Sequence, residues 1–221
     1  AFDSAGNIIY AGSFTGTIDV NPGSGTSDMV NQGNQNTPDV AVVKLNSDFQ
    51  FIQAYQIGSA DIGSVGVSFV RIDSFNDIYV MGAFSNKIDF EVPFPGGTLT
   101  GGQGFNVYIC KLNSNMLSVA WYKRFFANGM CGAEAFHIGP GNNLYLSASF
   151  NGTIYVTEQT SSTSFVDGGG GGDGLLVKMT SAGAISWSGR IGGNGLCIAK
   201  SLVTANNEEI YASGLYDMSN P

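Results

Sequence analysis

Short runs of apolar and β-branched residues, each bounded by Gly, Asn, Asp or Ser, recur along the whole chain. In the best-defined stretch they run from about Val65 to Ile72, Ile78 to Phe84, Asn106 to Leu112 and Val119 to Phe125. Runs of this length between turn residues predict β-strands. Because Gly and Asn tolerate the positive φ of tight turns, we expect neighbouring strands to pair as antiparallel hairpins.

The pattern repeats about every 66–70 residues. One marker is an aromatic residue that closes a Tyr-containing strand, at Phe14, Phe84, Phe150 and Tyr216. A second marker is a lysine that follows an Asp or Asn by five positions, at Lys44, Lys111 and Lys178. Two independent markers with one period indicate a repeat architecture such as a propeller, a solenoid or an array.

Four antiparallel strands per unit predict an all-β fold, a segment of a β-propeller built of four-stranded antiparallel blades. The expected units are 1–60 (an incomplete first blade), 61–128, 129–194 and 195–221 (the first two strands of a fourth blade), which together make one arc over 1–221. The chain starts without Met and stops soon after a strand, so we expect an arc that is completed by further blades of the same polypeptide or by self-association. Propeller rings typically have four to eight blades.

The connections between the second and third strands differ most from unit to unit. They run from Asn21 to Pro38, from Glu91 to Gln103 and from Glu158 to Gly172. Rigid scaffolds commonly carry their function on such loops. We therefore expect a protein or glycan partner to bind there.

The repeat resembles the bacterial SBBP-type repeat, also described as the seven-bladed β-propeller repeat. The resemblance covers nearly the whole chain and rests on short motifs in each unit: Gly6-Asn7, Gly12-Ser-Phe14, Gly16-Thr-Ile-Asp-Val20 and Asn21-Pro-Gly23, then Asp89-Phe90, Lys111-Leu112 and Trp121, then Gly152-Thr153, Asp173, Lys178, Trp187 and Gly192-Gly193. Tyr155, where the first two units have Asp19 and Asp89, departs from it. The resemblance implies a secreted or surface propeller of bacteria, and it implies neither a reaction nor a cofactor.

Charge narrows the choice of partners. The formal net charge is −8, with only nine Lys and Arg and no basic cluster. Such a surface repels phosphate groups, so we expect no nucleic-acid partner. Polar residues interrupt each hydrophobic run within roughly ten residues, which predicts no membrane insertion. The low Lys content with many Asn, Thr and Gly favours an extracellular or cell-surface location.

Candidate chemistry is sparse, so we assign no catalytic, cofactor-binding or metal-binding residue and favour a non-catalytic scaffold or binding module. The one histidine, His137, is expected at an ordinary strand position. The alternative is a polysaccharide-active hydrolase or lyase with acids from Asp19, Asp89 or Glu134 at the mouth of the channel. The stretch Asp19 to Gly23, followed by Asp28, offers oxygen ligands for calcium but lacks a full acidic set, and turn formation explains it as well.

Residues that recur at equivalent places are expected to serve packing. Cys131 and Cys197 are predicted to be buried small residues, because equivalent positions lie too far apart for a disulfide. Each repeated lysine is expected to lie along a blade edge or to pair with an Asp. Recurring aromatic residues, namely Tyr55, Trp121 and Trp187, are expected in the core between blades.

Overall fold

A computed structural model shows an all-β chain of antiparallel sheets, which confirms the predicted fold class at this level. The structure describes residues 1–33, 36–59, 63–90, 97–116, 118–157 and 162–216. Within these ranges the one helical segment is a 3-10 turn, η1 (Pro140–Asn142). Its residue Gly141 has a φ of 66°, which is readily adopted by glycine. No helix in the described ranges has the length and apolar character that a membrane crossing requires.

Contacts divide the chain into two compact units. The first comprises Ala1–Gly101 with Ile109–Tyr122, and the second comprises Gly102–Tyr108 with Lys123–Pro221. Strands β8 (Thr98–Leu112) and β9 (Val119–Ala127) contribute residues to both units. Each unit is described by itself below.

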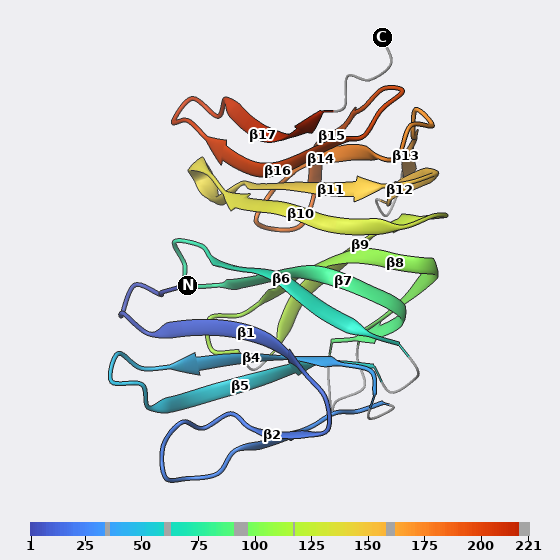
Figure 1. Ribbon diagram of the computed structural model, residues 1–221. Coiled ribbons are helices and arrows are strands. Elements are labelled where there is room, and N and C mark those ends of the chain that lie inside the picture. The colour runs from blue at the N-terminus through green and yellow to red at the C-terminus, as the bar shows by residue number, and fades with distance from the viewer. Residues whose placement is uncertain (34–35, 60–62, 91–96, 117, 158–161, 217–221) are drawn as a thin grey trace. The chain divides into compact units, whose positions relative to one another are not determined.

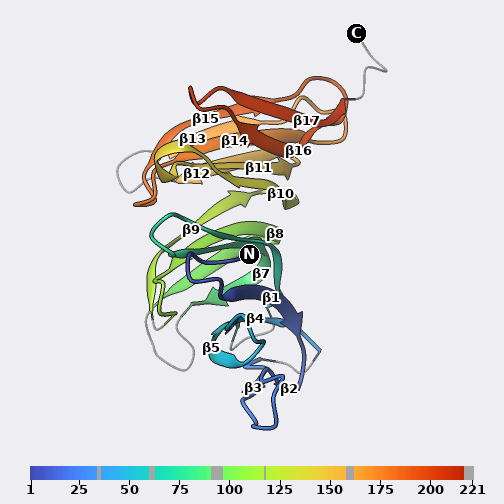
Figure 2. The same ribbon diagram turned by 90° about the vertical axis from the view of Figure 1, so that its left-hand side faces the viewer.

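The first unit contains two neighbouring sheets. One has the strand order β1-β4-β5, formed by β1 (Ile8–Phe14), β4 (Asp39–Leu45) and β5 (Phe51–Ile57). The other begins with the hairpin of β6 (Val65–Ile72) and β7 (Ile78–Asp89). Strand β6 lies next to β1 and β4, so the two sheets stack on one another (Figures 1 and 2).

The second unit repeats this arrangement. Its four-stranded antiparallel sheet has the order β10-β11-β14-β15, and a hairpin of two more strands lies on that sheet (Figure 1). The strands are β10 (Cys131–Ile138), β11 (Leu144–Phe150), β14 (Asp173–Met179), β15 (Ile185–Ile191), β16 (Cys197–Thr204) and β17 (Ile210–Tyr216). Strand β16 contacts β11 and β14 as β6 contacts β1 and β4, and it also contacts β10.

A local irregularity recurs with the repeat. In each hairpin of a first and a second strand, the register shifts by one residue near the middle of the first strand. The shifts lie at Val67/Phe69, Ala133/Ala135 and Ala199/Ser201. A bulge bends a strand and increases its twist, and a bulge at one fixed place indicates structurally equivalent hairpins.

The variable connections, which the sequence predicts to be loops, contain strands. Strands β2 (Thr17–Asp19) and β3 (Asp28–Val30) form a hairpin, as do β12 (Thr153–Thr157) and β13 (Ser162–Val166). In the repeat between them, β7 and β8 are longer than expected. Parts of all three predicted loops, at 34–35, 91–96 and 158–161, lie outside the described residues.

Two of the three insertions attach to the sheet before them. Strand β12 pairs with the end of β9 through Ile154 and Ala127, and Asp89 at the end of β7 pairs with Gly58 after β5. The sheet that contains β6 therefore has the order β6-β7-β8-β9-β12-β13. The described strands do not close into a ring, so a complete propeller is not part of the observed fold.

Most buried apolar side chains of the core come from the second and third strands of the repeats, and the first strands add a few more. In the first unit, Phe14, Val20, Val43 and Leu45 form one cluster, against which Phe51 packs. In the second unit, a cluster of Ala135, Tyr145, Ala199 and Leu202 joins the four-stranded sheet to β16. In the second unit the four-stranded sheet thus hides part of its apolar face against β16, as expected for stacked repeats.

Candidate functional site

The candidate site is a shallow groove in the first unit, between the loop from β2 to β3 and the turn from β4 to β5. It has a volume of about 480 Å³. Its lining residues are Asn21, Pro22, Gly23, Ser24, Gly25, Asp48, Phe49, Gln50 and Phe51. The first five belong to the connection that the sequence predicts to carry binding. The sequence analysis did not predict that residues of the turn from β4 to β5 would line a site. Phe49 was a detectable signal, because it occupies a turn position that favours glycine.

Hydrogen bonds within the loop hold its wall of the groove in place. The Oδ1 atom of Asp19 accepts the backbone N–H of Asn21 at 3.0 Å and that of Ser27 at 2.9 Å. The Oδ1 atom of Asn21 in turn accepts the N–H of Gly23 at 2.9 Å. Gly25 approaches Asn21 so closely that a Cβ there would lie 2.9 Å from its Nδ2 atom. The loop is thus pre-organised, which lowers the entropic cost of binding.

These hydrogen bonds also give a structural role to Asp19, which the sequence analysis considered as a calcium ligand. The N–H groups of Ser27 and Asn21 stabilise the charged carboxylate and lower the pKa of Asp19. Asp19 lies opposite Asp28 in the β2–β3 hairpin. In the described part of the chain, no three His, Cys, Asp or Glu side chains gather closely enough to hold a metal ion. Turn formation, the favoured interpretation, accounts for Asp19, and calcium binding stays an untested alternative.

The second wall is a rigid turn with a strained residue. The side chain of Asn46 accepts the N–H groups of Asp48 at 3.0 Å and Gln50 at 2.8 Å, and donates to Oε1 of Gln50 at 2.9 Å. Phe49 lies in this turn with a φ of 61°. Bulky side chains rarely adopt this left-handed conformation. The equivalent residue is Gly183 in the third repeat and Met116, which is buried, in the second.

The two phenylalanines of the groove have different supports. Phe51 is half-buried and packs on the core cluster of Phe14, Val20, Val43 and Leu45. Phe49 projects from the turn with 65 % of its surface exposed. The groove therefore combines a fixed apolar floor, an exposed aromatic ring, two amide side chains and one carboxylate.

The three acids of the enzyme hypothesis are each engaged by other groups. Backbone N–H groups hold Asp19, as described above. Asp89 lies 3.3 Å from Nζ of Lys87 and accepts the hydroxyl of Thr98 at 2.5 Å. Glu134 accepts Ser149 through Oε1 at 2.6 Å and Lys200 through Oε2 at 2.5 Å. None of these contacts forms the carboxylate pair that glycoside hydrolysis uses.

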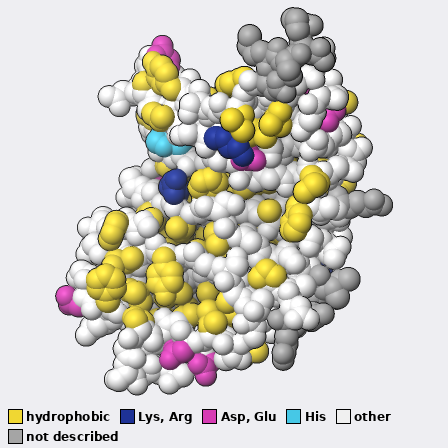
Figure 3. Space-filling model, viewed as in Figure 1, with side chains coloured by type: hydrophobic (Ala, Val, Ile, Leu, Met, Phe, Trp, Pro, Cys, Tyr) yellow, Lys and Arg dark blue, Asp and Glu magenta, His cyan; other side chains and the backbone are white. Residues whose placement is uncertain are grey.

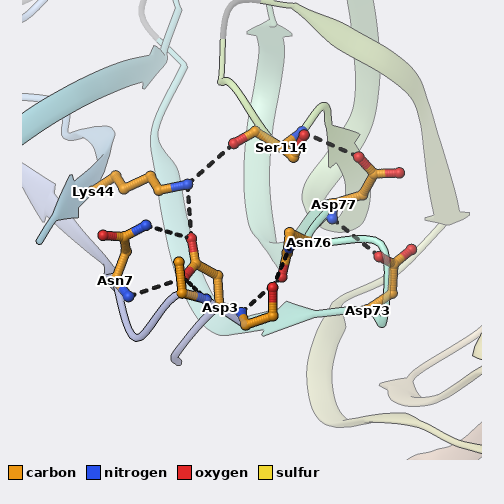
Figure 4. Close-up of polar contacts among 9 residues, drawn as sticks. Asp3, Asn7, Lys44, Asp73, Asn76, Asp77 and Ser114 are labelled. Carbon is orange, nitrogen blue, oxygen red and sulfur yellow. Dashed lines mark hydrogen bonds and ion pairs between the residues drawn. The ribbon is translucent and has the colours of Figure 1, made fainter. Parts of the chain in front are cut away.

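The repeated lysines are engaged as well, as the sequence analysis expected for Lys–Asp pairs. Lys44 lies 2.9 Å from Asp3 and donates to the backbone oxygen of Ser114 (Figure 4). Lys111 lies 2.8 Å from Asp77 and 3.5 Å from Asp73. Lys178 differs, because its partner is Glu208 at 2.7 Å. With these charges neutralised, the lysines do not form a site for an anion.

Other sequence-predicted residues have ordinary surroundings. His137 lies in β10, half-buried, with Nε2 3.1 Å from the hydroxyl of Thr204. All three cysteines are free thiols, and burial raises the pKa of Cys131 to about 12. Cys197 is only partly buried, and Trp187 in the edge strand β15 is 39 % exposed, so the expectation of burial in the core was wrong for these two residues.

The fold and the groove together define a class: an all-β repeat protein with a small polar and aromatic surface site. Comparison with models of known protein families found no match, and comparison with curated proteins found none either. The resemblance to the SBBP-type repeat therefore stays a prediction from the residues.

Proposed function

We propose that the chain is a section of an extracellular or cell-surface β-propeller of the bacterial SBBP type, a non-catalytic scaffold that binds protein or glycan through its variable loops. Three structural equivalences support the propeller. Markers one period apart lie on equivalent strands, the first hairpins share a bulge, and β6 and β16 stack in the same way on the sheet before them.

The free edge of β17 supports an arc that continues. Tyr211 of this strand is 58 % exposed, whereas its equivalents Tyr79 and Tyr145 are at most 1 % exposed. In the first unit β1 pairs with β4, and in the second unit β11 pairs with β14. In both cases the third strand of the repeat lies beside the second. Among the described residues β17 pairs with β16 alone. A third strand of the same repeat would supply the covering strand.

A peptide of residues 171–181, which contains the third-strand sequence of this chain, tests that continuation. We expect a fluorescent form of the peptide to bind the purified chain and to protect the amides of β17 from hydrogen exchange, since an exposed edge accepts an added strand. A peptide with Lys178→Glu is the matched control, because its carboxylate would face the acidic turn of Glu208 and Glu209. Equal binding of both peptides, or none of either, would contradict the proposed continuation.

The observation that carries the binding function is the groove. It lies on a connection that differs between repeats, on a rigid scaffold, and it exposes an aromatic residue in a conformation that costs folding free energy. Such strain persists where binding or catalysis uses it.

Binding arrays of glycans and of secreted proteins, run alongside turnover assays on the same glycans, test the proposed function. We expect binding without turnover, and loss of binding when residues 22–25 are replaced by Gly-Ser-Gly-Ser or when Phe49 is changed to Gly. Cleavage that disappears when Asp19, Asp89 or Glu134 is changed to its amide would establish the enzyme instead.

A further inference from the structure

The exposed ring of Phe49 has no structural role that its surroundings reveal. The backbone at this position favours glycine, and the third repeat has Gly183 there. In the second repeat Met116 at least gains burial for its side chain, whereas the Phe49 ring is 65 % exposed. The fold thus loses free energy at Phe49 without recovering it in packing. An interaction with something outside the chain explains the ring better than the fold does.

From the composition of the groove we infer that it binds a neutral saccharide, with the sugar ring stacked on Phe49; this inference rests on the proposed binding function. The C–H faces of pyranose rings are apolar, and they suit an exposed aromatic face. Phe51 adds a second aromatic surface that the core holds in place. The volume of about 480 Å³ is within the range of small-molecule sites and suits one or two sugar residues better than a folded domain.

The polar groups of the groove match sugar hydroxyls, which both donate and accept hydrogen bonds. Asp48 presents a carboxylate that accepts them. Gln50 uses its amide oxygen to accept Asn46, which fixes the side chain and directs its NH₂ donors. Asn21 uses its own oxygen for Gly23 and likewise keeps an NH₂ group as a donor. The groove therefore has side-chain amide donors on both walls, a carboxylate acceptor on one and the Ser24 hydroxyl on the other.

Charge excludes the main alternatives among glycans. Asp48 is the one charged residue of the lining, and no Lys or Arg belongs to it. Lys and Arg side chains are also few on the face of the molecule in Figure 3. Uronic acids, sulfated sugars and phosphates would meet a carboxylate in a chain of net charge −8. A strongly basic peptide would need more acids than this groove provides.

The experiment uses the purified chain and three sets of probes: neutral hexasaccharides (maltohexaose, cellohexaose and xylohexaose), anionic oligosaccharides (oligogalacturonate and heparin hexasaccharide), and an arrayed library of unmodified peptides. Saturation-transfer NMR detects binding, and titration gives dissociation constants. For a shallow groove we expect at least one neutral hexasaccharide to bind with a constant on the order of 1 mM. We expect neither anionic probe to bind within tenfold of that value.

Variants connect the binding to the groove. Phe49→Gly removes the ring at a position where glycine is the favoured residue, and we expect affinity to fall about tenfold. Phe49→Tyr keeps an aromatic face and should retain affinity within about twofold. Phe75→Ser removes an equally exposed phenyl ring from a different turn and should change nothing.

The outcomes separate this inference from the proposed function. Peptide binding that depends on Phe49, with no neutral saccharide bound, overturns the saccharide inference and supports a protein-binding groove. Saccharide binding that Phe49→Gly leaves unchanged places the sugar elsewhere and also overturns the inference. Absence of binding by all three probe sets contradicts both the inference and the proposed function.

Discussion

The ammonium group of Lys111 lies over the ring of Tyr79, 5.2 Å from its centroid, and both side chains converge on one buried carboxylate. The Tyr79 hydroxyl donates to Oδ2 of Asp73 at 2.9 Å, and Nζ of Lys111 lies 3.5 Å from the same atom. Burial and the hydrogen bond to Asp73 raise the pKa of the tyrosine far above its ordinary value. The tyrosine therefore stays a neutral donor at any physiological pH.

Because the side chain of Asp73 is fully buried, Lys111→Met should be costly. The substitution removes the ammonium group of the lysine and leaves the buried Asp73 carboxylate without a cation. We therefore expect the free energy of unfolding in urea to fall by about 2–4 kcal/mol. Lys178→Met is the matched control at the equivalent position. Its partner Glu208 is 43 % exposed, so the loss should be much smaller than that of Lys111→Met. Equal losses for the two variants would contradict the special role of the Asp73 cluster.

The Asp3–Lys44 pair predicts a loss of stability in acid. Burial opposes ionisation of Asp3, but hydrogen bonds from Lys44 and Asn7 outweigh it and lower its pKa to about 2. A lowered folded-state pKa stabilises the fold above the unfolded value near 4, and this contribution disappears as pH falls from about 4 to about 2. Allowing for solvent screening, we expect about 1 kcal/mol from this carboxylate.

The contribution of the Asp3 carboxylate to the free energy of unfolding can be isolated by urea unfolding of the natural chain and of Asp3→Asn at several pH values. The difference in stability between the two proteins should be largest above pH 4 and should shrink towards pH 2. Lys44→Met should reduce the pH dependence in the same range. A difference that stays constant between pH 5 and pH 2 would show that the pair does not lower the pKa of Asp3.

Glycines at one repeat position predict a contrast between two alanine variants. A Cβ on Gly82 would lie 2.0 Å from the backbone oxygen of Gly66 on the paired strand, whereas a Cβ on Gly12 meets nothing within 4 Å. Ala148 at the equivalent position of the third repeat shows that such a hairpin can adjust. We therefore expect Gly82→Ala to cost about 1–3 kcal/mol in thermal or urea unfolding and Gly12→Ala less than about 0.5 kcal/mol. Comparable losses of stability for the two variants would contradict the prediction, because they would mean that another strand covers the edge of β1 at Gly12.

Phe49→Gly should stabilise the chain. Relief of the left-handed conformation gains about 1–2 kcal/mol, and the greater freedom of glycine in the unfolded chain offsets about 0.5–1 kcal/mol of that. We expect a net gain of about 1 kcal/mol in urea unfolding. Phe49→Asn should give a smaller gain, since Asn tolerates positive φ less well than Gly. A loss of stability in both variants would show that the ring contributes to the fold after all.

The repeat made much of the fold predictable. Lys44, Lys111 and Lys178 mark strands β4, β8 and β14, and the expected bounds of β6 agree with the structure. Strands within the variable connections were not predicted, because runs such as Thr17–Asp19 are too short to stand out and owe their extended form to pairing across the hairpin. Turn residues with positive φ, such as Gly6 and Asn76, agree with the sequence analysis.

The site was predictable only in part. Variation between units pointed to the residues after Asn21, but the partner wall comes from a turn that looks alike in all three repeats. Whether Phe49 is exposed or buried depends on what lies beside the turn, since its equivalent Met116 is buried. The sequence analysis also predicted that Trp187 lies in the core, because an aromatic residue recurs at this position. Its exposure depends instead on whether a neighbouring sheet covers it.

The attachment of β12 to β9, and of Asp89 to Gly58, limits how these loops can change. The connections of the second and third repeats begin with residues that pair with the repeat before them, so only the residues beyond these pairs are free to diversify. Exchanging a whole connection between repeats would therefore loosen the array, while exchanging tips alone would alter recognition and keep the fastening. New binding specificity should therefore be engineered by replacing only the residues between the paired strands of a connection, such as residues 21–27 between β2 and β3.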